Sequence, residues 1–118
     1  MKETYGPQER IRKKKDFLSL YKNGKRFIGK YIVLIYLFND IAYSRMSVVV
    51  SKKHGNAVRR NKIKRQLRTL FRRNKILLSK SIDFLIIPKK EMQEATWTLL
   101  EEDYQRAVCL ITGTEKTQ

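Results

Sequence analysis

The chain has 118 residues but only one cysteine, Cys109, and one histidine, His54. A lone cysteine cannot form a disulfide within the chain, and its place in the apolar run AVCL predicts a buried structural thiol rather than a reactive one. Such sparing use of cysteine suits a reducing cytosol. The histidine lies in a predicted loop without a second histidine or a carboxylate nearby. We therefore interpret it as solvated or bonded to the backbone, and not as a general base.

Long hydrophobic segments are missing as well. The longest apolar run, YIVLIYLF at residues 31–38, is eight residues long and far too short to cross a bilayer. The N-terminal residues MKETYGPQERIRKKK lack the apolar region of a signal peptide, so we expect a cytoplasmic protein. The length and the 42% hydrophobic content predict one domain over residues 1–118, with a loose arm at 1–10 and a frayed tail at 113–118.

Acidic side chains are absent from the middle of the chain. Between residues 41 and 82 there are thirteen Lys and Arg and no Asp or Glu. Residues 1–40 carry a net charge of +6 and residues 83–118 a net charge of −3, so the formal charge of +16 is concentrated in one region. A merely soluble surface mixes its signs. The concentration of one sign predicts a polyanionic partner such as RNA, DNA or an acidic membrane surface.

Periodicity and turn residues predict an α+β fold with the element order α-β-β-α-β-α, in which helices pack on a small sheet. The predicted elements are a helix at 13–22, strands at 30–38 and 43–51, a basic helix at 56–74, a strand at 81–88 and a helix from residue 91. The first two strands are expected to be antiparallel. If the second and third strands are parallel and share a sheet, general statistics predict a right-handed crossover through the basic helix.

Cap residues mark three helix ends. Asn23 and Gly24 tolerate the left-handed conformation and predict the end of the first helix. Asn56 is a good N-cap for the basic helix. The last helix is expected to start at Glu91, with acids in its first turn that complement the helix dipole. The acids further along it are interpreted as a solvated face rather than a metal site: Glu101, Glu102 and Asp103.

The stretch SKKHGNAVRRNKIKRQLRTLFRR, residues 51–73, contains ten Lys or Arg and no acid. In a helix with about 3.6 residues per turn, one face collects its large apolar side chains, Ile63, Leu67, Leu70 and Phe71. Another side carries an uninterrupted row of cations four residues apart, Arg60, Lys64, Arg68 and Arg72. Each like-charged pair at this spacing weakens a free helix by about 0.2–0.5 kcal/mol.

This row of cations is better explained by phosphates than by solvent. Phosphates would neutralise the repulsion within the row, and the planar guanidinium of arginine holds phosphate oxygens in a bidentate manner. We therefore predict nucleic-acid binding. A protein that engages roughly six to ten phosphates loses about 10³–10⁵ in affinity between 50 and 200 mM salt. The basic helix, with Lys52 and Lys53 before it, offers that many contacts.

The segment VSKKHGNAVRRNKIKRQLRTLFR, Val50–Arg72, resembles the signature of the bacterial ribonuclease P protein subunit. That signature runs Ser-Lys-Lys, a spacer, Gly-Asn-Ala-Val, then Arg-Asn-Arg, Ile-Lys-Arg and Arg. The matching residues are Ser51, Lys52, Lys53, Gly55, Asn56, Ala57, Val58, Arg60, Asn61, Ile63, Lys64, Arg65 and Arg68. Lys62 departs, because the family usually has Arg there. The resemblance covers about residues 10–111 and implies a left-handed crossover at the basic helix, against the general rule.

The resemblance also implies a function. Ribonuclease P removes the 5′ leader from precursor tRNA, and in bacteria its RNA subunit performs the catalysis with Mg²⁺ held mainly by RNA and substrate. The protein is then an accessory subunit without catalytic or metal-binding residues of its own, and its partners are the catalytic RNA and precursor tRNA, with no membrane and no obligate protein partner. The residues implied to bind the RNA subunit are Lys52, Lys53, Asn56, Arg60, Asn61, Lys62, Lys64, Arg65 and Arg68.

A second surface is implied to hold the single-stranded leader, in a cleft between the first helix and the sheet. Phe17 and Tyr21 match the family's aromatic positions, and their i,i+4 spacing places both on one face, suited either to stacking on bases or to core packing. A strand aromatic is expected to join them, Tyr31 in preference to Tyr36. Among the basic residues before the helix, Arg12, Lys13 and Lys14 either contact phosphates or form a solvated arm.

Two other classes share some of these features. A ribosomal or other structural RNA-binding protein would have a similar charge and fold class, but the spacing of the signature argues against it. A DNA-binding module would place the basic helix in a major groove, but the sequence shows no helix-turn-helix partner for it.

Overall fold

The structure is a computed structural model that describes residues 4–113. It confirms the α+β class. The main elements are α1 (Lys14–Asn23), β1 (Lys25–Ile28), β2 (Ile32–Phe38), β3 (Arg45–Val48), α2 (Ala57–Arg73), β4 (Ile82–Pro88) and α3 (Trp97–Thr112). Four short 3₁₀ helices join them: η1 (Pro7–Glu9), η2 (Lys52–His54), η3 (Lys75–Leu77) and η4 (Lys90–Glu94). Within residues 4–113, no helix is long and apolar enough to cross a membrane.

The four strands form one mixed sheet in the order β1-β2-β4-β3. β1 and β4 each pair with β2 in antiparallel fashion, and β3 pairs with β4 in parallel. The two strands predicted at 30–38 and 43–51 therefore run in opposite directions, as expected, but they are not neighbours because β4 lies between them. Strand β1 was not predicted, because this four-residue edge strand has two exposed cations and lacks the apolar pattern of a buried strand.

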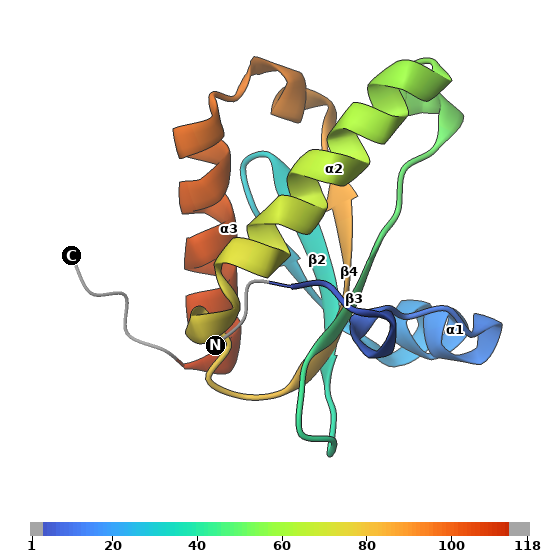
Figure 1. Cartoon of the computed structure of the whole chain (residues 1–118), viewed down its shortest axis with the longest axis vertical. Helices are drawn as coiled ribbons and strands as arrows, with labels where there is room; N and C mark the ends of the chain where they lie inside the picture. The colour runs from blue at the N-terminus through green and yellow to red at the C-terminus, as the bar shows by residue number, and fades with distance from the viewer. Residues whose placement is uncertain (1–3, 114–118) are drawn as a thin grey trace.

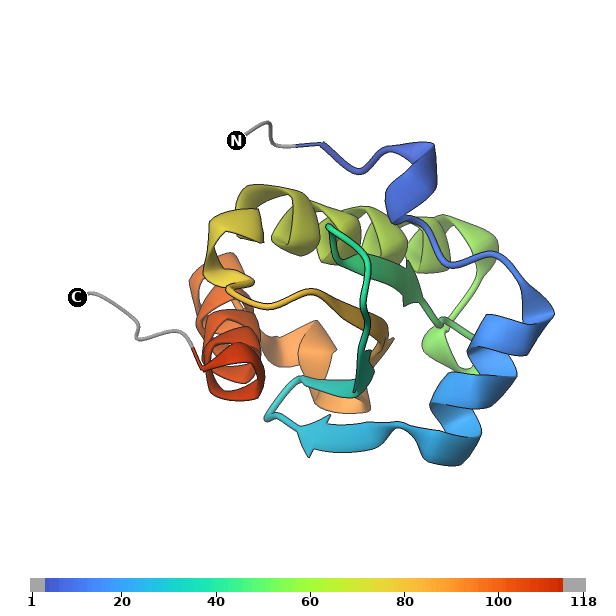
Figure 2. The ribbon, with the colours of Figure 1, turned by 90° about the horizontal axis from the view of Figure 1, so that it is seen from below.

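The crossover from β3 through α2 to β4 is left-handed. In Figure 2 these parallel strands run away from the viewer, and the chain passes counterclockwise from β3, across α2, and back to β4 beside it. The general preference for right-handed crossovers fails here. The handedness implied by the family resemblance is the one observed.

Helices cover both faces of the sheet (Figures 1 and 2). On one face, α2 and α3 enclose the main core, which contains Leu67 and Phe71 of α2, Tyr104 of α3, and Met46 and Phe84 of the sheet. On the other face, α1 covers a smaller core, formed by Ile11, Leu20, Ile35 and Leu85. The apolar face predicted for the basic helix is confirmed, because Leu67, Leu70 and Phe71 are buried and Ile63 packs against them.

Helix α1 ends at Gly24, but not in the predicted left-handed conformation. Gly24 has φ −69° and ψ 148°, an extended backbone that leads directly into β1. Glycine is needed there because of space: a Cβ atom would lie 2.4 Å from the carbonyl oxygen of Leu20 and 2.7 Å from Cγ2 of Ile35.

We expect the Gly24→Ala substitution to lower the free energy of unfolding by about 2 kcal/mol, as overpacking of a tight contact does. Urea denaturation measures the change. Gly6→Ala is the matched control, because the nearest atom to its added Cβ would be Oε1 of Glu9 at 3.7 Å. Equal stability of the two variants would contradict this account of the α1–β1 junction.

Helix α3 begins at Trp97 and not at Glu91. The 3₁₀ helix η4 occupies Lys90–Glu94, the backbone is extended at Ala95, and the side chain of Thr96 caps α3 by accepting a hydrogen bond from the backbone N–H of Leu99. The predicted acids therefore lie outside its first turn. The side chains of Leu100, Tyr104, Ala107 and Val108 are buried in the main core.

The N-terminal arm predicted to be loose is packed where the structure describes it. The hydroxyl of Tyr5 donates to the carbonyl oxygen of Met46 at 2.7 Å, and the carboxylate of Glu9 lies 2.5 Å from Nζ of Lys75. These contacts come from residues far along the chain, so no local pattern in residues 1–10 could predict them. Of the predicted frayed tail, all but Gly113 lies outside the described residues.

The fully buried hydroxyl of Tyr104 has no hydrogen-bond partner among the described residues. Burial raises the pKa of this phenol far above its ordinary value of 10.0. The unfolded chain therefore ionises Tyr104 above about pH 10, whereas the folded chain keeps it neutral, so stability is lost as the pH rises above that value.

We expect Tyr104→Phe to raise the free energy of unfolding by about 1 kcal/mol, because it removes a buried donor that has no partner. The variant should also lose less stability than the wild type between pH 9 and 11, roughly the range in which free tyrosine ionises. Urea denaturation across that range measures both effects. A destabilised variant would show that the hydroxyl is satisfied in solution.

Candidate nucleic-acid interface

We define the α2 surface as the nine residues predicted to bind the RNA subunit. The structure brings them together on α2 and on the turn that leads into it. Seven are exposed, namely Lys52, Lys53, Asn56, Asn61, Lys62, Arg65 and Arg68, whereas Arg60 and Lys64 are half-buried at the edge of the apolar face. The side chain of Asn56 accepts a hydrogen bond from the backbone N–H of Arg59 at 2.9 Å, so the predicted N-cap is confirmed.

The turn before α2 is fixed by Gly55 and His54. Gly55 has φ 112°, and a Cβ atom there would lie 2.7 Å from Cδ of Arg59, so glycine is required. The backbone N–H of Ser51 donates to Nδ1 of His54 at 3.0 Å. With that nitrogen as acceptor, Nε2–H of the neutral ring donates to the carbonyl oxygen of Pro88, also at 3.0 Å. The interpretation of His54 as a backbone-bonded residue is confirmed, and the ring ties the turn to the end of β4.

Asp83 and Asp16 are paired with Arg45 of β3 rather than with cations of the α2 surface. Within the described part of the chain, no ion pair involves a basic residue of α2. Asp83 accepts a hydrogen bond from Nε of Arg45 at 2.9 Å, which is the main reason that the pKa of Arg45 is raised, and Asp16 lies 3.8 Å from the same guanidinium. The cations of α2 are therefore not neutralised by any ion pair within residues 4–113.

Asp103 is a correction to the sequence analysis, which placed it on a solvated face. It is 2% exposed, and its carboxylate accepts hydrogen bonds from the backbone N–H groups of Lys30 and Tyr31 at 3.0 and 2.9 Å. It thereby fixes the turn between β1 and β2. Among residues 4–113, no three His, Cys, Asp or Glu side chains form a group that could hold a metal ion.

The α1 face, with Phe17 and Tyr21, lies on the opposite side of the sheet from α2. Phe17 is half-buried against the smaller core, and Tyr21 is 43% exposed. Both positions leave ring surface accessible on α1. Arg12 and Lys13 are exposed immediately before the helix.

Tyr31 does not join these aromatics. It is 6% exposed and belongs to the main core, on the side of α2 and α3, and Tyr36 packs against that same core. The expectation of a strand aromatic beside α1 is therefore wrong for both residues. The side chains of β2 that face α1 are aliphatic, Ile35 and Leu37.

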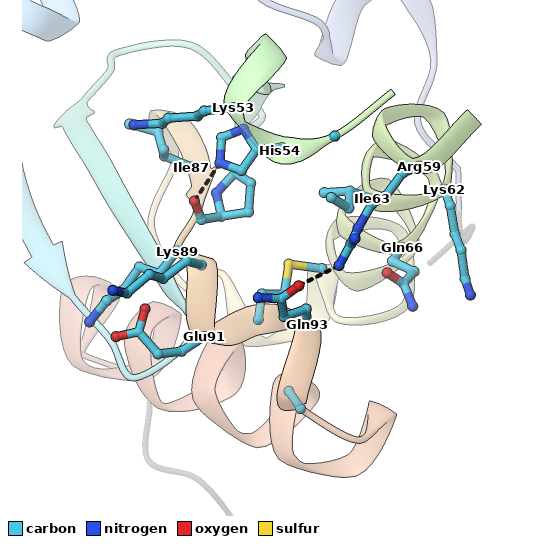
Figure 3. A pocket seen from close by; sticks show the side chains of 15 residues that line it. Lys53, His54, Arg59, Lys62, Ile63, Gln66, Ile87, Lys89, Glu91 and Gln93 are labelled. Carbon is cyan, nitrogen blue, oxygen red and sulfur yellow. Dashed lines mark hydrogen bonds between the residues drawn. The ribbon is translucent and has the colours of Figure 1, made fainter. Parts of the chain in front are cut away.

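A groove of about 990 Å³ adjoins the α2 surface, between the start of α2 and the segment that follows β4 (Figure 3). Cations on its rim come from both segments: Lys53, Arg59, Lys62, Lys89 and Lys90. Its apolar lining includes Ile63, Ile87 and Met92. Arg59 reaches across the groove to donate a hydrogen bond to the side chain of Gln93.

Arg59, Lys89 and Lys90 line this groove, although they are not among the predicted site residues. The pair of lysines directly after Pro88 was a signal that a basic segment ends the strand. Only the pairing of β4 with β3 brings that segment beside the turn before α2.

A small α+β domain whose basic helix contains no acid and forms no ion pair with any described residue defines a nucleic-acid-binding protein. Comparison with known families identifies the family of nucleic-acid-binding proteins to which the chain belongs. The family model of ribonuclease P matches residues 6–111, and the chain belongs to this family.

Individual relatives agree with this assignment. The ribonuclease P protein component of Thermotoga maritima is 40% identical over 107 residues, which cover 86% of this chain and 92% of the relative. The solved structure of the Thermotoga maritima protein superposes with a TM-score of 0.77 at 38% identity, covering 85% of this chain and 94% of that one. The Staphylococcus aureus protein gives a TM-score of 0.78 at 30% identity, covering 91% and 98%.

Proposed function

We propose that this protein is the protein subunit of ribonuclease P. The subunit binds the catalytic RNA and the 5′ leader of precursor tRNA. It thereby assists the Mg²⁺-dependent endonucleolytic removal of that leader. Membership of the ribonuclease P family supports this proposal. The observation that carries it is the α2 surface, whose cations form no ion pair with any described residue.

The protein, on this proposal, contributes binding and orientation rather than bond cleavage. The RNA subunit performs the reaction, and Mg²⁺ is held mainly by that RNA and the substrate. The residues of the α2 surface neutralise and position phosphates of the catalytic RNA. By holding both RNAs, the protein lowers the entropic cost of bringing the leader to the reacting centre. We place this activity in the cytoplasm, with RNA partners and no obligate protein partner.

Two separate surfaces support simultaneous contact with both RNAs. The apolar face of α2 packs in the main core on one face of the sheet, and α1 packs in the smaller core on the other face. In Figure 2, α2 runs along the β3 edge of the sheet, and α1 lies beside the face opposite α3. We assign Phe17 and Tyr21 to the leader, because base–aromatic stacking accepts any sequence and contributes about 1–3 kcal/mol per base. Lys13, exposed at the start of α1, would add a phosphate contact to the same strand.

Reconstitution tests the proposal. The purified protein is mixed with a bacterial ribonuclease P RNA at low Mg²⁺, and cleavage of a precursor tRNA is followed by gel electrophoresis. We expect the protein to increase cleavage well above the rate with RNA alone. The protein treated with ribonuclease and tested without RNA is the control and should leave the precursor intact. No gain on reconstitution, or cleavage without any RNA, would overturn the proposal.

A further inference from the structure

The N-terminal arm, residues 5–12, forms the outer edge of the sheet beside β3. The ring of Tyr5 packs edge-on against Phe71 of α2, with 5.4 Å between ring centroids. Its hydroxyl and the backbone N–H of Ile11 both donate to the carbonyl oxygen of Met46, at 2.7 and 3.1 Å. Arg10 forms a parallel bridge with Met46 as well. The arm is thus fixed on the sheet edge and runs past α2 toward α1 (Figure 2).

The arm passes from one face of the sheet to the other, and this passage sets the direction of its arginines. Tyr5 packs against the main core beneath α2, whereas Ile11 is 3% exposed in the smaller core beneath α1. Neighbouring side chains of an extended segment point to opposite sides. Arg10 and Arg12 flank Ile11, are both exposed, and therefore point away from the α1 core.

Arg10 confirms this direction by its contacts. Its guanidinium lies over the ring of Tyr5, 4.8 Å from the centroid, and Nη2 donates to the carbonyl oxygen of Tyr5 at 3.4 Å. Since Tyr5 itself packs on α2, the guanidinium of Arg10 is on the α2 side of the sheet edge.

The charges of Arg12 and Arg68 also act on Tyr5. Burial raises the pKa of the Tyr5 phenol, and the positive charges of Arg10, Arg68 and Arg12 act against that rise. The one acid acting on the phenol is Glu9, whose carboxylate is paired with Lys75. Arginines of the arm and of α2 therefore act on one side chain, and a bound polyanion would relieve the repulsion between their charges.

We propose that the arm extends the α2 surface across the β3 edge, and that Arg10 and Arg12 join Arg68 in binding phosphates of one RNA. The partner is the phosphodiester backbone of the RNA that α2 holds, which is the catalytic RNA if the proposed function holds, and not the leader. Tyr5 acts as a positioning residue that keeps the two arm arginines beside α2.

The test is the salt dependence of RNA-subunit binding by the Arg12→Gln variant, measured by filter binding on the full chain. Each phosphate contact that is lost should lower the slope of log affinity against log salt by about 0.9. We expect that change for Arg12→Gln and about twice it for Arg10→Gln combined with Arg12→Gln. Arg106→Gln, an exposed arginine on α3, is the matched control and should leave the slope unchanged.

A second pair of variants tests the arm without altering its charge. Tyr5→Ala removes the ring from Phe71 and should reproduce the slope change of the double arginine variant. Tyr5→Phe keeps the ring and should retain most of the slope. If Tyr5→Ala left the slope at its wild-type value, the arm would not need its anchor and the positioning role would be wrong.

Failure of this inference is distinguishable from failure of the proposed function. If reconstitution succeeds and Arg65→Ala lowers the slope while Arg12→Gln does not, the arm is not part of the surface. If Arg12→Gln weakens only the binding of leader-bearing substrate, the arm belongs to the α1 face and the inference is also overturned. If reconstitution itself fails, the proposed function is wrong.

Discussion

Replacing Arg65 and Arg68 together with alanine should weaken binding of the ribonuclease P RNA about a hundredfold. Each lost bond between a guanidinium and a phosphate costs about 1.5 kcal/mol, and about 1.4 kcal/mol corresponds to a factor of ten. The slope of log affinity against log salt should fall by about two, one for each phosphate released. Filter binding or fluorescence titration from low to high salt measures both quantities.

The structure makes this variant interpretable. Arg65 and Arg68 are exposed and take part in no ion pair within the described residues, so the fold should retain its stability to within about 0.5 kcal/mol. Arg106→Ala is the matched control, since its side chain is 61% exposed on α3, outside the α2 surface. An unchanged salt slope in the double variant, with affinity lost through unfolding, would contradict the assignment of the α2 surface.

Replacing Phe17 with alanine should produce a different phenotype, a loss of about tenfold in affinity for leader-bearing precursor tRNA with little change for mature tRNA. The reason is the loss of one stacking contact, which contributes about 1–3 kcal/mol per base. The measured quantity is the dissociation constant of mature tRNA divided by that of precursor tRNA, determined with the reconstituted holoenzyme. Phe17→Ala should lower this ratio. Tyr21→Ala should lower the same ratio.

Phe17 is half-buried, so its packing must be separated from its stacking. Phe17→Leu keeps apolar volume against Ile11, Leu20 and Leu85, and should retain stability while losing the preference for the leader. Phe38→Ala removes an aromatic that is 53% exposed at the end of β2, and should leave the ratio unchanged. If Phe17→Leu kept the full leader preference, the ring would be only a packing residue.

Local signals in the sequence predicted the basic helix well. An N-cap at Asn56, an apolar face through Leu67 and Phe71, and cations around the rest of the helix are all properties of residues within 23 positions of one another. Because the α2 surface is carried by one helix and its preceding turn, the sequence sufficed to bring its nine residues together.

Features that depend on tertiary contacts were missed. One is the order of the strands, in which β4 lies between β2 and β3. Another is the packing of the N-terminal arm, whose partners Met46, Phe71 and Lys75 are distant in sequence. The same limit explains the error at Tyr31. Its position is set by the turn that Asp103 fixes from α3, and not by strand alternation.

Site-specific photocrosslinking in the reconstituted holoenzyme tests the two-surface account most directly. A benzophenone side chain is introduced at position 61 on α2 or at position 21 on α1, and the crosslinked RNA is identified by primer extension in the presence of leader-bearing precursor tRNA. We predict crosslinks to the catalytic RNA from position 61 and to leader nucleotides from position 21. Crosslinks from both positions to the same RNA would contradict the account.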